Sequence, residues 1–408
     1  MKIWKALILL SAAFLSACND TPNSFGDEFI PSEDRYKFQQ TENNSIADSN
    51  YYQELTPSTV SLGEAVVLGK KGDLESTVLM RFPLTAPDSI KSMMQDGSIT
   101  ITNTWVKMNS LYYIGDKNGT FDFTGHRLNN ETNFDNIKPS TFPSVTYDQN
   151  DIIVPGSKVL TDTTLTFKLN TNLVKDWIKV QYDSLNTPRN YGIILKPTTN
   201  SAKLISFLGY ETTFGTATAV FFEFEKRNST GLVYKDTLSA FATKDTYYAT
   251  QPVPAQTDQY IVIQGGFAHR NKIKFNLPQL PTNAVMNQAI LEIYYDSLKS
   301  VTGTAYDPDF GNFGTMLNIG YITDPVKLSI DSLTVQFLSR QTAPYRGKFS
   351  GDITAYAQKW INEGKNNGLL ITVNGEAYDL SRLYFYGTNY QVASLRPKLK
   401  ITYSIRNN

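Results

Sequence analysis

The sequence predicts an all-β protein with two tandem antiparallel β-sandwich domains of the jelly-roll type, each carrying one short helix. Aromatic residues make up 12% of the 408 residues, led by 24 Tyr and 23 Phe, and this composition favours strands. Polar and apolar residues alternate through 98–102, 164–169 and 398–403, so each of these segments can bury one face as a strand. An internal repeat indicates that one such domain occurs twice.

The repeat begins with Asp48–Tyr52, which is echoed by Lys244–Tyr248. The offset between matching residues then falls steadily along the chain, as expected when one copy of a domain has gained small loop insertions. We therefore place the first domain at 36–227, the second at 230–408, and their junction at 226–231. The matching pairs are Tyr51 and Tyr247 at an offset of 196, Phe82 and Phe275 at 193, Trp177 and Trp360 at 183, and Gly192 and Gly368 at 176.

The only cysteine, Cys18, follows a segment with the features of an export signal. Two lysines precede an apolar run over 6–15 that is too short to span a bilayer. The last four residues, Leu-Ser-Ala-Cys, resemble the lipobox of bacterial lipoproteins, in which the cysteine is lipidated and the preceding peptide is removed. This resemblance implies a signal peptide at 1–17 and a lipid on Cys18. Residues 18–35 are mostly polar and are predicted to form a flexible tether.

One short helix is predicted in each copy. In the second copy, apolar residues at helical spacing run from Ile353 to Ile361, with Asp352 suited to cap the helix and Gly364 to end it. Because two tryptophans occupy matching helix positions, we expect both to lie in the core rather than at a ligand. The matching helix of the first copy carries Leu173, Val174, Trp177 and Ile178, and the second tryptophan is Trp360.

Composition and motifs argue against several classes of function. Charged residues make up 19% of the chain, and 38 basic residues balance 38 acidic ones, so neither nucleic acid nor an acidic membrane surface is the expected partner. His126 and His269 lack the spacing of a metal motif, and no hydrolase elbow, phosphate loop or zinc-protease helix occurs. We therefore expect that the protein is not an enzyme, although a glycosidase, which needs only two carboxylates, stays open.

The repeated motifs resemble the DNRLRE-type carbohydrate-binding module, a family of extracellular modules that attach to polysaccharide. The resemblance rests on a strand ending in a basic-apolar-Phe-x-Leu pattern, a Phe followed by a helix that ends in Trp, and an Asn-x-Gly-apolar strand. The second copy closes on the further pattern Pro-x-Leu-x-Ile-x-Tyr at 397–403, whereas the first copy closes at 218–224 without it. This resemblance implies a β-sandwich and a polysaccharide ligand, but it supplies no ligand residue.

A glycan site requires exposed aromatic rings, because the C–H faces of sugars stack on them, with polar side chains alongside. The candidates are aromatic residues that break the repeat and lie among loop-forming residues, with Asn318 or Arg346 as polar partners. They are Trp105, Tyr112 and Tyr113 in the first copy, and Tyr306, Phe310, Phe313 and Tyr345 in the second.

A turn in the second copy gathers possible metal ligands. Asp307, Asp309 and Asn312 could bind calcium through their side-chain oxygens, although the segment lacks the full spacing of a calcium loop. The alternative is an ordinary turn with solvated carboxylates. No other cofactor is expected.

Six tripeptides combine Asp, then Ser or Thr, then an apolar residue or Thr. They resemble an O-glycosylation sequon of periplasmic and surface proteins in one Gram-negative phylum, but Asp-Ser is equally a common way to open a turn. They begin at Asp88, Asp162, Asp183, Asp236, Asp296 and Asp331.

These observations predict an outer-membrane lipoprotein, facing the cell surface or the periplasm and held to the membrane by its N-terminal lipid alone. The expected function is non-catalytic binding of a polysaccharide or of the cell-surface matrix. The alternative is a structural or adhesive surface protein that binds protein partners. An exposed aromatic cluster would favour the glycan, whereas a long bare edge strand would favour the protein partner.

Overall fold

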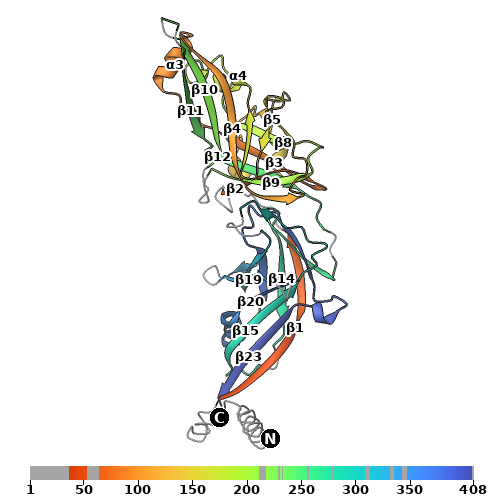
Figure 1. Ribbon diagram of the computed structural model, residues 1–408. Helices are drawn as coiled ribbons and strands as arrows, with labels where there is room; N and C mark the ends of the chain where they lie inside the picture. Colours follow the sequence, from red (N-terminus) through yellow and green to blue (C-terminus); the bar gives the residue numbers. More distant parts are fainter. Residues whose placement is uncertain are drawn as a thin grey trace, which may run out of the picture.

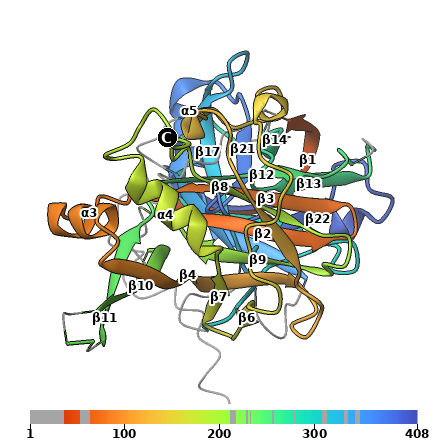
Figure 2. The same ribbon diagram turned by 90° about the horizontal axis from the view of Figure 1, so that it is seen from above.

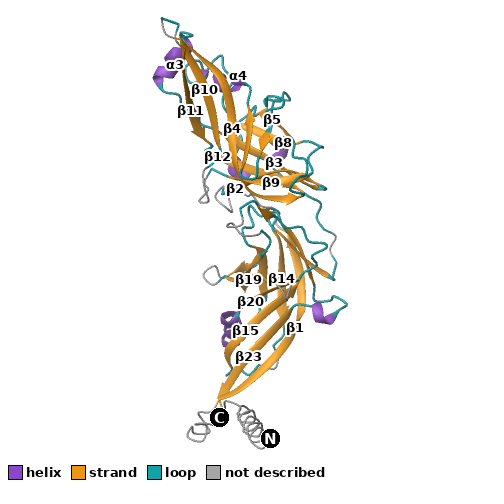
Figure 3. Ribbon diagram, in the orientation of Figure 1, coloured by secondary structure: helices purple, strands orange, loops and turns teal. Residues whose placement is uncertain are grey.

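The computed structural model describes residues 36–52, 64–210, 217–227, 230–231, 233–254, 257–277, 280–307, 313–330, 335–341 and 347–406. The prediction of an all-β protein is confirmed, because almost all regular structure lies in two large antiparallel sheets (Figure 3). The sheets form two lobes placed end to end along the long axis of the molecule (Figure 1). We call the strands between residues 65 and 250 the first lobe, and the strands of 36–52 and 260–406 the second lobe.

The second lobe contains a closed ring of eight strands. The ring closes because β1 pairs with β23 on one side and with β14 on the other. Two further strands, β13 and β22, extend the sheet beyond β14, and β18 pairs with β17. In ring order the strands are β1 (Tyr36–Tyr52), β23 (Lys398–Arg406), β15 (Val285–Tyr294), β20 (Lys348–Asp352), β19 (Gln336–Arg340), β17 (Met316–Asp324), β21 (Leu369–Val373) and β14 (His269–Phe275); outside it lie β13 (Tyr260–Gln264), β22 (Arg382–Tyr386) and β18 (Ser329–Ile330).

The first lobe is a curled sheet of twelve strands. One of these, β16 (Thr304–Ala305), comes from the sequence of the second lobe and pairs with the end of β4. The main path runs through β11 (Val233–Phe241), β10 (Ala219–Arg227), β4 (Ile99–Gly115), β9 (Lys203–Leu208), β2 (Ala65–Lys71), β3 (Leu74–Arg81), β8 (Ile193–Pro197) and β5 (Phe123–Arg127), and β12 (Lys244–Thr250), β7 (Thr164–Lys168) and β6 (Val159–Leu160) branch from it.

The predicted helices are present as α4 (Thr171–Lys179) and α5 (Thr354–Glu363). Gly364 ends α5 in the left-handed conformation, as predicted, and the Asp352 carboxylate accepts a hydrogen bond from the backbone N–H of Thr354. The expectation of one helix per copy is wrong for the first lobe, because a further helix, α3 (Asp88–Gln95), packs beside α4 (Figure 2). Single 3-10 turns occur at η3 (Phe134–Asn136), η4 (Phe142–Ser144) and η6 (Ala393–Leu395).

The first strand of each sequence repeat completes the sheet of the other repeat. β1 precedes the first lobe in sequence, yet all of its strand partners, β14 and β23, belong to the second lobe. Conversely, β11 and β12 open the second repeat but pair with β10 and β3 of the first lobe. The two predicted segments, 36–227 and 230–408, therefore exchange their first strands.

The register of the exchanged strands corrects the predicted alignment by one residue. Asp48 lies opposite Ile273 on β14, and Asp245 lies opposite Met80 on β3. Ile273 and Met80 are themselves separated by the repeat offset of 193, so Asp48 corresponds to Asp245 at an offset of 197 rather than 196. The predicted match of Tyr51 with Tyr247 is wrong, because at this offset Tyr51 corresponds to Tyr248.

Each lobe has its own apolar core, and the two helix tryptophans belong to these cores as predicted. Trp177 is 1% exposed and lies against Phe82, with ring centroids 6.2 Å apart. Trp360 is 4% exposed and lies near Tyr321. Within the described part of the chain, no helix is both long and apolar enough to cross a membrane.

Candidate functional site

Tyr112, predicted as an exposed ligand platform, is instead fully buried at the joint between the lobes. It lies on β4, not in a loop. Its hydroxyl donates to the carbonyl of Tyr378 at 2.6 Å and accepts from the backbone N–H of Leu380 at 3.1 Å. Both hydrogen-bonding roles of this hydroxyl are therefore used inside the protein, and the prediction for this residue is wrong.

Three further predicted aromatics lie beside Tyr112. The ring of Phe313 is 4.1 Å from that of Tyr112, and Tyr306 lies 4.9 Å from Tyr113 between ring centroids. β16, which directly precedes Tyr306, pairs with β4 at Tyr112 and Tyr113. Four of the seven predicted aromatic residues thus lie together. These four residues break the repeat because they form contacts between the lobes.

The other predicted site residues do not form a common cluster in the described part of the chain. Trp105 stacks on Phe221 across β4 and β10, with centroids 5.4 Å apart. Asp307 is exposed, Asn318 lies on β17, and no group of three potential metal ligands occurs among the described residues. Outside the described residues lie Cys18, Asp309, Phe310, Asn312, Tyr345 and Arg346.

The joint is completed by the segment between β21 and β22, which enters the first lobe. Leu380 of this segment belongs to the core of the first lobe, and the hydroxyl of Tyr247 on β12 donates to the carbonyl of Ala377. Arg270 donates to both carboxylate oxygens of Glu376, at 2.8 and 2.5 Å. Burial raises the pKa of Asp379, whose carboxylate accepts from the backbone of Gly314 and Ser381. Leu380 and the Tyr247–Ala377 hydrogen bond join the lobes, while the contacts of Glu376 and Asp379 fix the inserted segment within the second lobe.

A cluster of four half-buried tyrosines, Tyr260, Tyr384, Tyr386 and Tyr390, lies on β13, β22 and the loop that follows them; we call it the tyrosine patch. The rings of Tyr386 and Tyr390 are 4.3 Å apart. Tyr260 lies 5.9 Å from Tyr386, 5.8 Å from Tyr390 and 6.2 Å from Tyr384. Each ring thus contacts at least one other, so the four form one continuous aromatic surface.

Charged and amide groups border the tyrosine patch. The ammonium group of Lys299 lies 3.8 Å from the ring centroid of Tyr260, a cation–π contact. The carboxylate of Asp296 lies 3.5 Å from the Tyr260 hydroxyl. The hydrogen bond that the Lys299 ammonium donates to Tyr260 is the main cause that raises the pKa of this lysine above its ordinary value. The patch therefore offers aromatic faces beside a cation and a carboxylate.

The exchanged strand β1 fixes the loop that carries Tyr390. The Asp48 carboxylate on β1 accepts from the backbone N–H of Thr388 at 2.6 Å, and the Ser45 and Thr388 hydroxyls are 2.9 Å apart. From the other side, the Gln259 amide donates to the carbonyl of Asn389 at 3.0 Å. The loop is thus held from two strands, which limits the positions that Tyr390 can adopt.

Among the residues that the structure describes, the first lobe has no counterpart of Tyr260, Tyr384 and Tyr386. The pairing of β2 with β9 and of β13 with β22 places Ala65 at the position of Tyr260 and Leu208 at that of Tyr386, and Ser206 at that of Tyr384. All three first-lobe residues are buried. From the sequence, Tyr384 and Tyr386 are predicted only as part of a repeated aromatic strand, although Ser206 and Leu208 in the other copy mark these positions as different.

The Asp-Ser/Thr tripeptides lie at the surface wherever the structure describes them. Asp296 accepts from the backbone N–H groups of Leu298 and Lys299, at 3.0 and 3.2 Å, which is the local geometry of a turn opener. The tripeptide at Asp331 lies outside the described residues. The exposed hydroxyl residues are Ser89, Thr163, Ser184, Thr237 and Ser297.

No family model and no curated protein matches the chain. Among solved structures, it is similar to the T6 backbone pilin of serotype M6 Streptococcus pyogenes, described as a modular three-domain structure decorated with variable loops and extensions. The identity is 10%, the TM-score is 0.16, and the match covers 78% of this chain and 51% of the pilin chain, about half its length. A TM-score of this size carries no argument about fold or function.

Proposed function

We propose that the protein is a surface-anchored lipoprotein that binds polysaccharide without catalysis, and that the tyrosine patch is its main contact with the glycan. In this proposal Cys18 carries the lipid, and residues 18–35 separate the outer membrane from the β domains. The domains face the cell surface or the periplasm. Membrane contact is limited to the lipid.

The observation that carries this proposal is the tyrosine patch itself. Sugar rings present C–H faces that pack on aromatic rings, and their hydroxyls require hydrogen-bond partners close by. Four half-buried tyrosines with Lys299 and Asp296 beside them meet both requirements. Because the patch is open rather than a deep cavity, it suits a segment of a chain better than a single small sugar.

The proposal extends to the domain type. We propose that both lobes are jelly-roll-like sandwiches related to the DNRLRE-type module. Support comes from the closed ring of the second lobe and from the equivalent placement of Trp177 and Trp360 on α4 and α5. Within the described residues the tyrosine patch occurs in the second lobe alone, so we propose that this lobe binds the glycan while the first lobe has another role.

A polysaccharide array tests this function directly. The matched variant replaces three patch residues by those of the first lobe, Tyr260→Ala, Tyr384→Ser and Tyr386→Leu, in a Cys18→Ser chain that needs no detergent. We expect the parent chain to bind at least one polysaccharide, and the variant to bind it about tenfold or more weakly, because each aromatic contact contributes about 0.5–1.5 kcal/mol. Equal binding by both proteins would reject the site, and silence of a folded parent chain across the array would reject the function.

A second candidate function, adhesion to a protein partner, is favoured by two bare strand edges. β11 pairs only with β10, and the Tyr36–Asn44 half of β1 pairs only with β23, among the described residues. Side chains on both faces of these segments are mostly exposed, including Phe38 and Tyr234. Such an edge can accept an added strand from a partner. Thr237→Pro, which removes the N–H that donates to the Asp236 carboxylate at 2.7 Å and places a proline in this edge strand, should weaken a protein complex but leave polysaccharide binding unchanged.

A further inference from the structure

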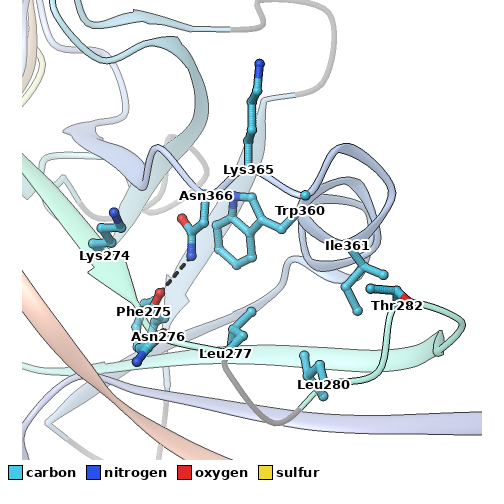
Figure 4. Close-up of a pocket in the computed structure, with 11 residues that line it drawn as sticks. Lys274, Phe275, Asn276, Leu277, Leu280, Thr282, Trp360, Ile361, Lys365 and Asn366 are labelled. Atoms are coloured by element: carbon cyan, nitrogen blue, oxygen red, sulfur yellow. Dashed lines mark hydrogen bonds between the residues drawn. The ribbon is translucent and has the colours of Figure 1, made fainter.

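A cavity in the second lobe lies between α5 and the segment that follows β14. Its volume is about 350 Å³, at the lower end of the range for small-molecule sites. The apolar side chains of Leu277, Leu280 and Ile361 project into a common space beside the ring of Trp360 (Figure 4). None of these residues takes part in the tyrosine patch, so the cavity is a separate feature of the lobe.

The same place in the first lobe is closed by a glutamine. Gln181 follows Trp177 by four residues, just as Gly364 follows Trp360. The Gln181 amide donates to the carbonyls of Leu84 at 2.6 Å and Trp177 at 3.0 Å, and its oxygen accepts from the backbone N–H of Ala86 at 3.2 Å. The glutamine thus ties the helix to the segment that follows β3.

In the second lobe, glycine leaves this position without a side chain. Gly364 has φ 62°, and a Cβ built on it would meet nothing within 4 Å. One contact beside this position is shared by the two lobes. Asn366 donates to the carbonyl of Phe275 at 2.7 Å and accepts from Gly368, as Asn190 does with Phe82 at 2.8 Å and Gly192. Gly364 precedes Asn366 by two residues, whereas Gln181 precedes Asn190 by nine, so the opening accompanies both a missing side chain and a shorter connection.

The charges at the cavity have one sign. Lys274 and Lys365 extend from its edge (Figure 4), and no acidic residue lines it. The side chain of Thr282 and that of Asn276 add hydrogen-bonding groups to the wall. A ligand that fits this cavity has an apolar part that packs against the leucine and isoleucine side chains, and an anionic group that pairs with the lysines.

We infer that the cavity beside Trp360 binds a small organic anion with an apolar body, such as a carboxylate on an aryl or alkyl chain. The ligand's apolar part replaces water against Leu277, Leu280 and Ile361, and its carboxylate lies near Lys274 and Lys365. This site is independent of the polysaccharide proposal, because it uses none of the patch residues. Binding of polysaccharide and binding of the organic anion can therefore be tested independently, and either can be absent without the other.

Calorimetric titration of the Cys18→Ser chain with phenylbutyrate, phenylbutanol and phenylbutylamine tests the inference. These probes share one apolar body and differ in charge. We expect phenylbutyrate to bind about threefold to tenfold more tightly than the alcohol, because its carboxylate is attracted by two exposed lysines, and the amine to bind most weakly. Equal affinities for the three probes, or no binding of any probe to the folded chain, would overturn the inference.

Two substitutions at one position separate filling of the cavity from backbone strain. Gly364→Gln adds a long side chain at a residue that lines the cavity and should weaken phenylbutyrate binding about tenfold or more. Gly364→Ala imposes the same left-handed backbone cost, about 1 kcal/mol, but adds only a Cβ in open space, so it should keep binding within about twofold. Reversal of both charges, Lys274→Glu with Lys365→Glu, should make phenylbutylamine the preferred probe. Undiminished phenylbutyrate binding by Gly364→Gln would place the ligand elsewhere.

Discussion

Asp48 and Asp245 make equivalent hydrogen bonds in opposite lobes, and each aspartate lies on a strand that comes from the other repeat of the sequence. The Asp48 carboxylate accepts from the backbone N–H of Thr388 at 2.6 Å, and the Asp245 carboxylate accepts from that of Tyr210 at 2.8 Å. Both donors directly follow the glycine that ends an equivalent strand, β22 or β9. The same hydrogen bond, from a backbone N–H to an aspartate on an exchanged strand, is therefore present in both lobes.

Loss of the Asp48 carboxylate should disturb the tyrosine patch. Asp48→Ala leaves the N–H of Thr388 without its acceptor, which costs about 1–3 kcal/mol of unfolding free energy and loosens the loop that carries Tyr390. Urea unfolding should show this loss together with weaker polysaccharide binding. Asp245→Ala is the matched control: it should destabilise the first lobe by a similar amount and leave polysaccharide affinity unchanged. Equal effects of the two variants on binding would refute the role of β1 in shaping the patch.

The strand exchange can be tested by disulfide formation, because Cys18 is the only native cysteine and Cys18→Ser removes it. Ala47 and Lys274 are exposed partners on β1 and β14. Ala47→Cys with Lys274→Cys should form an intramolecular disulfide on mild oxidation, detected by mobility in non-reducing gels and by peptide mapping.

The control pair places β1 in its own repeat instead. Arg81 is the first-lobe counterpart of Lys274, since it lies opposite Lys244 on β12. Ala47→Cys with Arg81→Cys should not form a disulfide in the folded chain. Efficient bridging of this second pair, with none in the first, would mean that β1 lies in the first lobe.

Acid should destabilise the protein through His269, which is 3% exposed at the joint. Burial, with a smaller contribution from Arg382, lowers the pKa of His269 to about 4, whereas an unfolded histidine has a pKa near 6.5. The unfolded state therefore binds the proton first, and stability falls as the pH drops from about 6.5 to about 4, by at most about 3 kcal/mol.

The histidine contribution can be isolated by comparing pH profiles. Urea unfolding of the parent chain and of His269→Gln should give curves whose separation narrows as the pH falls through this range. Burial raises the pKa of Asp379, an opposite effect on stability, but this carboxylate is present in both proteins and cancels in the difference. Parallel profiles would show that His269 does not titrate in this way.

The lipid anchor has a simple test. In detergent phase partition of cell extracts, the native protein should enter the detergent phase and Cys18→Ser should stay in the aqueous phase, because removal of the thiol removes the only proposed membrane attachment. A Cys18→Ser protein that still enters the detergent phase would contradict lipidation at this residue.

The sequence predicts the local elements well because their signals are local. Alternating polarity predicts the strands that begin at Ile99, Thr164 and Lys398, and helical spacing predicts α4 and α5. The strand exchange could not be predicted in this way. Since β1 and β12 pair with equivalent strands, β14 and β3, a local sequence pattern does not determine which lobe each strand completes.

The candidate site was misplaced for a related reason. A residue that breaks the repeat shows only that the two copies differ at that position. At Tyr112 they differ because this residue contacts the other lobe. A single sequence cannot distinguish such a contact from contact with a ligand. The tyrosine patch went unnoticed because Tyr384-Phe385-Tyr386 also fits a buried aromatic strand. Comparison with Ser206 and Leu208 in the first copy was the available signal, since a shared core position should remain apolar in both copies.

Affinity electrophoresis in gels that contain the polysaccharide found on the array tests the central claim most directly. The parent chain should be retarded in proportion to the polysaccharide concentration, and the Tyr260→Ala, Tyr384→Ser, Tyr386→Leu variant should migrate as in a gel without polysaccharide. A joint variant, Tyr112→Phe, should be retarded like the parent chain, because that hydroxyl contacts only the protein. If the patch variant is retarded as strongly as the parent chain, the tyrosine patch is not the glycan site.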